Sequence, residues 1–297
     1  MDKSYLTQLV NGTNSKPLVC LEVNPPKGTD YEPIFKRLDE FHEGIHFFNI
    51  TDSALARLKC APIPFGYLLK ERYGIEPLIN CSCRDRNSIA LQSDLLGGWI
   101  LGIRSFIALT GDAVALGDHK EAKAVFEMNS VKLLETMSSL NNGRDISGAE
   151  LIGAPKFVPG VVVNPNARNM EAEIKRLQKK KEAGALYALS QPVFEEESSV
   201  EFFKLAGELK IPILMGLLPF KNKDTAANFC AIPGIKICED MIKKIESLDS
   251  ASVEQFSLDL CLKLVKLNSP HVAGFHIISG RTPKLALKLT SEVIKGL

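Results

Sequence analysis

The chain has 297 residues, of which 45% are hydrophobic, and a formal net charge of +1. This near-neutral balance, without a basic stretch interleaved with aromatic residues, argues against nucleic acid as a partner. No apolar run is long enough to cross a bilayer, and residues 1–17 lack the apolar core of a signal peptide, so we expect a cytoplasmic protein without membrane contact. Seven cysteines, an odd number, indicate reduced thiols rather than a disulfide framework.

A short apolar run followed by a helical stretch recurs along the chain. The expected strands are 18–24, 46–51, 76–83, 105–110, 158–163, 185–190, 211–217 and 274–279. The expected helices are 2–11, 30–43, 62–73, 87–101, 120–140, 169–183, 198–208, 223–230, 237–247, 251–268 and 282–295. This order predicts an α/β fold, a single (β/α)8 TIM barrel over residues 1–297, with an N-terminal helix and extra helices before the last strand. A doubly wound sheet is the alternative, but no G-x-G-x-x-G follows the first strand.

The first strand carries one acidic residue in an otherwise apolar run. Because side chains alternate along a strand, Glu22 shares a face with Cys20 and Asn24. A carboxylate near the end of a buried strand is costly unless it is paired or used. Glu22 is therefore a candidate for chemistry, and a salt-bridged structural glutamate is the alternative.

Polar residues follow most of the expected strands. In a (β/α)8 barrel, these carboxyl ends meet on one face, where the active site lies. The residues there include Glu22, Asn24, Thr51, Asp52, Ser82, Arg84, Asp85, Thr110, Gly111, Asp112, Asn164, Ser190, Gln191, Ser279 and Arg281. Such a ring suits acid–base chemistry and hydrogen bonding to a polar heterocycle. Gly111 lets the backbone approach a flat ligand, although a strand-to-loop turn explains it as well.

Other motifs have plainer interpretations. Cys81 and Cys83 form half a metal site at most, and two buried thiols explain them better. Asp85 or Asn87 is expected to cap a helix, with solvated arginines beside it. Residues 179–181 are three lysines on an expected helix, a solvated face by default. No strand contains the lysine of a Schiff-base aldolase, and the five histidines are too few and too poorly placed for a metal-dependent hydrolase.

Taken together, these motifs resemble the methylenetetrahydrofolate reductase family, flavin-dependent barrel enzymes that reduce methylene- to methyl-tetrahydrofolate. The similar segments run in order through almost the whole chain: 21–26, 49–52, 81–85, 102–112, 183–185, 190–194 and 216–219. The pattern at 84–87, 95–97 and 110–112 is most similar to the short bacterial branch. In that branch the reductase often works with a partner subunit or is fused to a methyltransferase.

The resemblance implies two catalytic residues and one substrate contact. Glu22 corresponds to the family's catalytic glutamate, the general acid that protonates N10 of the folate substrate. Asp112 corresponds to an aspartate near the pyrimidine edge of the flavin, and Gln191 to a glutamine that contacts the pterin. Burial in the apolar strand would raise the pKa of Glu22 and so suit it to donate a proton.

The resemblance also implies the cofactor contacts. They are Thr51, Asn80, Thr110, Gly111, Asp112, Asn164 and Lys180, the lysine lying near the cofactor phosphates. Many members have histidine at Asn80, arginine at Thr110 and tyrosine at Asn164, and some have phenylalanine at Lys223. FAD is the expected flavin with FMN as the alternative, and NAD(P)H is the candidate electron donor.

The expected function is therefore flavin-dependent reduction of 5,10-methylenetetrahydrofolate by hydride transfer from the flavin N5. An alternative is a flavin-barrel subunit that takes electrons from an iron–sulfur partner, and a third is a non-catalytic folate- or flavin-binding scaffold. The chain is expected to form a homo-oligomer or to bind a partner electron-transfer or methyltransferase-like subunit, with helices 237–268 as the candidate interface.

Overall fold

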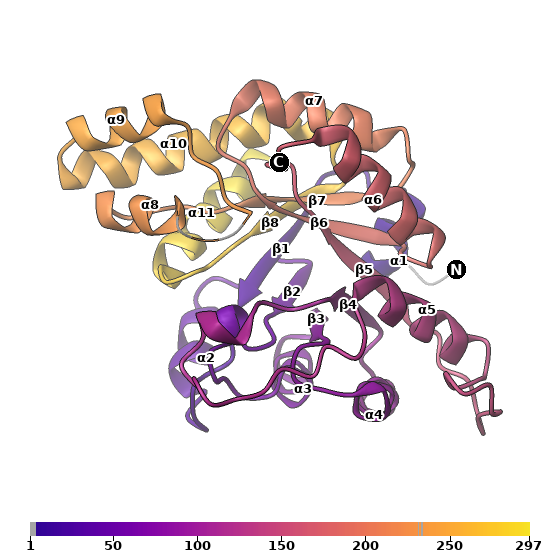
Figure 1. Ribbon diagram of the computed structural model, residues 1–297. Helices are drawn as coiled ribbons and strands as arrows, with labels where there is room; N and C mark the ends of the chain where they lie inside the picture. Colours follow the sequence, from indigo (N-terminus) through magenta and orange to yellow (C-terminus); the bar gives the residue numbers. More distant parts are fainter. Residues whose placement is uncertain (1–3, 231, 233) are drawn as a thin grey trace.

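The computed structural model describes residues 4–230, 232 and 234–297. Within these residues, eight parallel strands close into a barrel in sequence order, with β1 paired to β8 (Figure 1). The strands are β1 Leu18–Val23, β2 Phe47–Ile50, β3 Glu76–Ser82, β4 Ser105–Leu109, β5 Val158–Val163, β6 Tyr187–Pro192, β7 Ile213–Leu217 and β8 Gly274–Ile277. The predicted (β/α)8 barrel is confirmed.

Helices surround the barrel and close one end of it. They are α1 Tyr5–Asn11, α2 Glu32–Asp39, α3 Pro62–Tyr73, α4 Ser88–Ile100, α5 Ser130–Asn141, α6 Met170–Glu182, α7 Glu196–Gly207, α8 Lys223–Cys230, α9 Glu239–Ser247, α10 Ser250–Asn268 and α11 Pro283–Gly296. Short 3-10 turns are η1 Ala54–Ala56, η2 Val114–Leu116 and η3 Ser269–His271. The extra helices predicted before the last strand are α9 and α10, which stand out with α8 to one side of the barrel in Figure 1.

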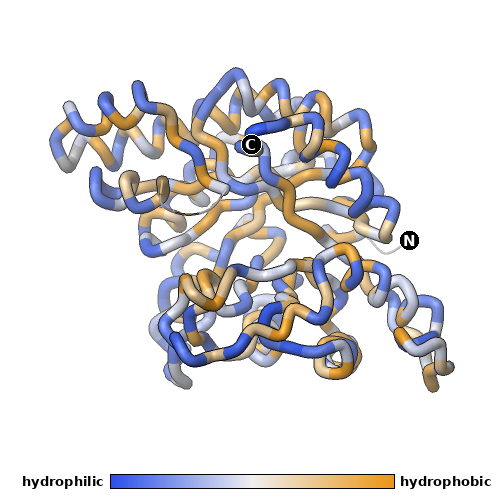
Figure 2. Tube along the Cα trace, viewed as in Figure 1, coloured by the Kyte–Doolittle hydropathy of each residue, from blue (hydrophilic) through white to orange (hydrophobic). Residues whose placement is uncertain are grey.

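Successive side chains of each strand alternate between a core inside the barrel and a core between the barrel and the helices. Cys20 packs inside the barrel, where Leu6 and Leu9 of α1 cover the floor. Val19 and Leu21 face outward and pack in the larger cluster beneath the helices. Figure 2 shows the matching hydropathy, with apolar positions through the strands and hydrophilic positions along outer helices such as α6. Glu22, two residues after Cys20, therefore faces the barrel interior, as the alternation predicts.

One helix prediction is wrong over about half of its length, at residues 120–129. The helix predicted at 120–140 begins only at Ser130, because Asn129 caps it by accepting hydrogen bonds from the next turn. Residues 120–129 instead run as an irregular segment over the loop after β3. The backbone N–H of Val125 donates to the carbonyl of Arg84 at 2.7 Å, a tertiary contact that overrides local helix propensity.

The remaining differences are small shifts at the element ends. The sixth strand was expected at 185–190 and lies at Tyr187–Pro192. The first helix begins at Tyr5, and residues 2–3 of the expected helix lie outside the described residues. Among the residues that the structure describes, no helix combines the length and apolar character needed to cross a bilayer.

Candidate functional site

The Glu22 side chain lies in a hydrogen-bonded network at the carboxyl end of β1. Its Oε1 accepts from the Asn24 amide at 3.1 Å, from the Ser279 hydroxyl at 3.0 Å and from the Gly280 backbone N–H at 3.1 Å. Burial raises the pKa of Glu22 above its ordinary value, although these hydrogen bonds act in the opposite direction. The largest influences on the pKa of Glu22 include no lysine or arginine, which argues against the salt-bridge interpretation.

Thr51 joins the same network from β2. Its hydroxyl donates to the Asn24 amide oxygen at 2.8 Å, and the residue is buried. The amide of Asn24 thus receives one hydrogen bond and donates to Glu22 and to Ser279. Residues from β1, from the end of β2 and from the segment after β8 therefore meet around one carboxyl group.

A cavity of about 360 Å³ opens at the carboxyl ends of β4, β5 and β6. The residues that line it are Ala108, Leu109, Thr110, Ser130, Val162, Val163, Asn164, Glu173, Arg176, Lys180, Gln191 and Gly234. Four residues that the sequence predicted for the cofactor or the substrate, Thr110, Asn164, Lys180 and Gln191, are thus brought together.

Lys180 differs from its two lysine neighbours on α6. Its ammonium group donates to the Val162 carbonyl at 2.6 Å, and burial lowers the pKa of Lys180. Lys179 and Lys181 are exposed, as a solvated helix face predicts. Only the middle lysine therefore reaches the cavity wall.

Sequence reasoning missed two charged residues of this cavity. Glu173 is buried, accepts the Asn164 backbone N–H at 3.0 Å and pairs with Arg176 at 3.1 Å. Glu173 and Arg176 precede Lys180 on α6, and the three residues are spaced by three and four positions. Residues three and four apart share one side of a helix, so this spacing was the available signal.

Thr110, Gly111 and Asp112 form a tight link between β4 and the neighbouring loops. Gly111 has a φ of +100°, and a Cβ there would lie 2.3 Å from the Ser82 hydroxyl, so only glycine fits. The Asp112 carboxylate accepts the Leu55 backbone N–H at 2.7 Å. Leu55 itself has a left-handed φ of 55° in η1. Asp112 therefore holds a strained turn in place beside the site.

Two residues that depart from the family pattern have partners within the fold. The Asn80 amide oxygen accepts from the Asn49 side chain at 2.8 Å, inside the barrel. The Lys223 ammonium group donates to the Glu246 carbonyl at 2.6 Å, between α8 and α9. Asn80 does not line the cavity between β4 and β6.

The arginines after β3 are not solvated, which corrects the sequence-based expectation. Arg84 is 2% exposed and pairs with Asp85, while Arg86 pairs with Asp52 at the end of β2. Burial raises the pKa of Asp52, and the Arg86 guanidinium opposes that shift. Asn87 caps α4 by accepting from the Ala90 N–H at 2.9 Å, as predicted.

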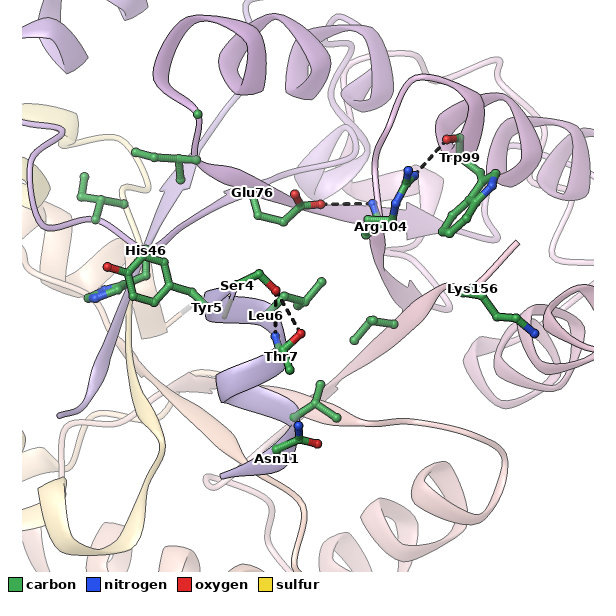
Figure 3. A pocket seen from close by; sticks show the side chains of 15 residues that line it. Ser4, Tyr5, Leu6, Thr7, Asn11, His46, Glu76, Trp99, Arg104 and Lys156 are labelled. Atoms are coloured by element: carbon green, nitrogen blue, oxygen red, sulfur yellow. Dashed lines mark hydrogen bonds between the residues drawn. The ribbon is translucent and has the colours of Figure 1, made fainter. Parts of the chain in front are cut away.

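A larger cavity, of about 590 Å³, lies at the opposite end of the barrel (Figure 3). Residues of α1, together with His46, Glu76 and Arg104, line it. Its charged groups are already engaged, since the Arg104 backbone N–H donates to Glu76 and its guanidinium donates to the Trp99 carbonyl. None of the residues expected to bind cofactor or substrate lies there.

A closed barrel with a partly buried acid and a polar cavity at its carboxyl face defines a (β/α)8-barrel enzyme. The profile described as methylenetetrahydrofolate reductase matches residues 6–293. The chain therefore belongs to the methylenetetrahydrofolate reductase family, whose reaction makes it an oxidoreductase of one-carbon metabolism.

Known relatives agree with this family. The 5,10-methylenetetrahydrofolate reductase of Salmonella typhimurium is 27% identical over 213 residues, covering 70% of this chain and 67% of the relative. The enzyme of the same name from Pectobacterium carotovorum is 25% identical and covers 87% of this chain and 84% of its own length. A Clostridium thermocellum protein, described as binding two copies of 5-methyl-5,6,7,8-tetrahydrofolic acid, has the same fold, with a TM-score of 0.71 at 16% identity and coverage of 99% and 100%.

Proposed function

We propose that this chain reduces 5,10-methylenetetrahydrofolate to 5-methyltetrahydrofolate with a bound flavin, and that Glu22 is the general acid. The observation that carries the acid assignment is a carboxyl with a raised pKa, held by three neutral hydrogen-bond donors at the carboxyl end of β1. Family membership supports the substrate. The Clostridium thermocellum protein of the same fold is described as a binder of methyltetrahydrofolate, which agrees with a folate site.

The cavity between β4 and β6 carries side chains that suit a flavin. Lys180 and Arg176 supply cations near its wall for cofactor phosphates, and Thr110 and Asn164 supply hydrogen-bonding groups. FAD is the proposed form and FMN the alternative, with NADH or NADPH as the electron donor. When bound, the flavin supplies the hydride that reduces the methylene carbon.

The proton step uses Glu22 and the folate alone. The bond between the methylene carbon and N10 breaks, its electron pair stays on N10, and N10 takes the proton of Glu22. The methylene carbon is left double-bonded to a positively charged N5, ready to accept a hydride. A carboxyl whose pKa burial raises is suited to donate a proton.

Two further side chains act on position and charge. The Asp112 carboxylate is anchored through Leu55 and places a negative charge beside the β4 end, which favours the cationic form of the substrate. Gln191, partly buried in the cavity wall, offers an amide that can donate and accept toward the pterin ring. Asp112 thus acts through its charge and Gln191 through position, while Glu22 supplies the proton.

The test is Glu22→Gln, with Glu150→Gln as a control because Glu150 is an exposed residue in the loop after α5. We expect Glu22→Gln to keep bound flavin and its reduction by NADH or NADPH, while folate turnover falls at least about 100-fold. Normal folate turnover in this variant would disprove the acid assignment. A colourless purified protein that takes up neither FAD nor FMN would disprove the flavin assignment, and reduction only in the presence of an iron–sulfur protein would disprove direct use of NAD(P)H.

A further inference from the structure

Three hydrogen bonds to Glu22 converge on one of its two oxygens, and the Ser279 backbone N–H also acts on this carboxyl. The Asn24 amide, the Ser279 hydroxyl and the Gly280 backbone N–H all donate to Oε1, at 3.0–3.1 Å. A carboxyl that carries a proton has one carbonyl oxygen, which accepts, and one hydroxyl oxygen, which donates. An oxygen that faces three donors is suited to be the carbonyl oxygen, because a proton there would oppose the donors.

The donors are themselves held in orientation. The Ser279 hydroxyl accepts from the Asn24 amide at 3.0 Å, so its single hydrogen is left for Glu22. The amide of Asn24 is in turn oriented by the Thr51 hydroxyl, which donates to its oxygen at 2.8 Å. Ser279 is 5% exposed and Thr51 is 4% exposed, so water competes little for these groups.

We propose that Ser279 and Asn24 are positioning residues that assign the acid proton of Glu22 to Oε2 by making Oε1 the carbonyl oxygen. This inference rests on the proposed function, since it concerns how the acid delivers its proton. Oriented donors of this kind fix both the rotamer of the carboxyl and the oxygen from which the proton leaves. The Gly280 backbone N–H contributes the third donor, which no side-chain substitution removes.

The other titratable groups around Glu22 do not replace this arrangement. Burial raises the pKa of the Cys20 thiol, two residues earlier on the same face, well above its ordinary value. His276, which lies opposite Cys20 on β8, has its pKa lowered to about 3 by burial. Both are therefore neutral over the working pH range, and the proton of Glu22 is controlled by neutral hydrogen-bond donors.

Four variants test the proposal by folate turnover as a function of pH. We expect Ser279→Ala to lower turnover about tenfold, and Ser279→Thr, which keeps the hydroxyl, to restore it. Removing a donor that stabilises the carboxylate raises the pKa of Glu22, so the alkaline limb of the profile should move to higher pH in Ser279→Ala and in Asn24→Ala. Thr282→Val removes a neighbouring hydroxyl that donates to the Pro219 and Ser279 carbonyls and not to Glu22, and should leave the profile unchanged.

A spectroscopic measurement on the protein without folate tests the same point independently of turnover. The carbonyl stretching band of the Glu22 carboxyl is isolated as the infrared difference between wild type and Glu22→Gln. We expect Ser279→Ala and Asn24→Ala to move this band to higher frequency, because a carbonyl with fewer donors is stiffer, and Ser279→Thr to leave it in place.

The outcomes separate this proposal from the proposed function. If Glu22→Gln is inactive while folded Ser279→Ala and Asn24→Ala keep the wild-type band and alkaline limb, the positioning proposal is wrong and the acid assignment stands. If Ser279→Thr fails to restore what Ser279→Ala loses, the effect belongs to packing and the proposal is also wrong. Full turnover in Glu22→Gln would overturn both.

Discussion

The buried histidine of β8 predicts a measurable acid sensitivity of the fold. His276 is 5% exposed, and among the described residues neither of its ring nitrogens has a hydrogen-bond partner. Burial lowers its pKa from the ordinary 6.5 to about 3. The unfolded chain therefore binds a proton at this residue as the pH falls through the ordinary value, while the folded chain does not. Stability from this group is present above that value and is lost as the medium becomes more acidic.

The size of the effect follows from these two pKa values. Between about pH 7.5 and about pH 5, His276 should lower the free energy of unfolding by about 2 kcal/mol, since each pH unit below the ordinary pKa is worth about 1.4 kcal/mol. His276→Leu removes this loss. It should cost little at the higher pH, because it replaces an unpartnered buried imidazole with an apolar side chain of similar size.

The assay is urea denaturation at both pH values, followed by circular dichroism. The quantity of interest is the difference between wild type and His276→Leu, because other groups titrate in the same range. The same substitution at His271, in the 3-10 turn before β8, serves as control. If wild type and His276→Leu lose the same stability on acidification, the imidazole is not kept neutral by burial and the reasoning fails.

Three further predictions concern the loops and the cavity. Gly111→Ala should destabilise the protein by about 2 kcal/mol or more, seen as a lower thermal midpoint, because the new Cβ would meet the Ser82 hydroxyl at a φ that disfavours it; an unchanged midpoint would refute this. Lys180→Met should weaken flavin binding about tenfold in a fluorescence titration, whereas Lys179→Met, at an exposed neighbour, should not; equal effects would remove Lys180 from the cofactor site. Gln191→Leu should raise the KM for the folate about tenfold with flavin retained, and an unchanged KM would exclude a pterin contact.

Much of the fold could be predicted because most strands and helices have a recognisable pattern in their own local sequence. Buried parallel strands read as short apolar runs, and their helices begin at caps such as Asn87 and Asn129. The helix prediction for residues 120–129 was wrong because the conformation of this segment is not determined by its local sequence. Its conformation depends on a hydrogen bond to Arg84, which is distant in sequence, and no local pattern encodes such a contact.

The candidate site likewise contains residues that the local sequence identifies and contacts that it does not. Glu22 could be singled out because a lone acid in an apolar strand is a local anomaly. Its partner Ser279 is separated from it by 257 positions in sequence, and the alternation of strand residues does not say which polar strand ends touch. Arg84 was expected in solvent, since arginine is usually exposed, and it is buried because Asp85 and the Ser53 carbonyl accept its hydrogen bonds.

The pairing of the first strand with the last has a consequence for how the enzyme is made. Glu22 is translated with β1, the first strand of the barrel, while Ser279 and Gly280 are translated after β8, the last strand. During synthesis a ribosome-bound chain can present strands β1 to β7, with Glu22 already in place, and still lack both donors from the β8 side. A nascent chain therefore holds Glu22 without two of its donors, and the hydrogen-bond network around this carboxyl is complete only once β8 and the segment after it have been made and the barrel closes.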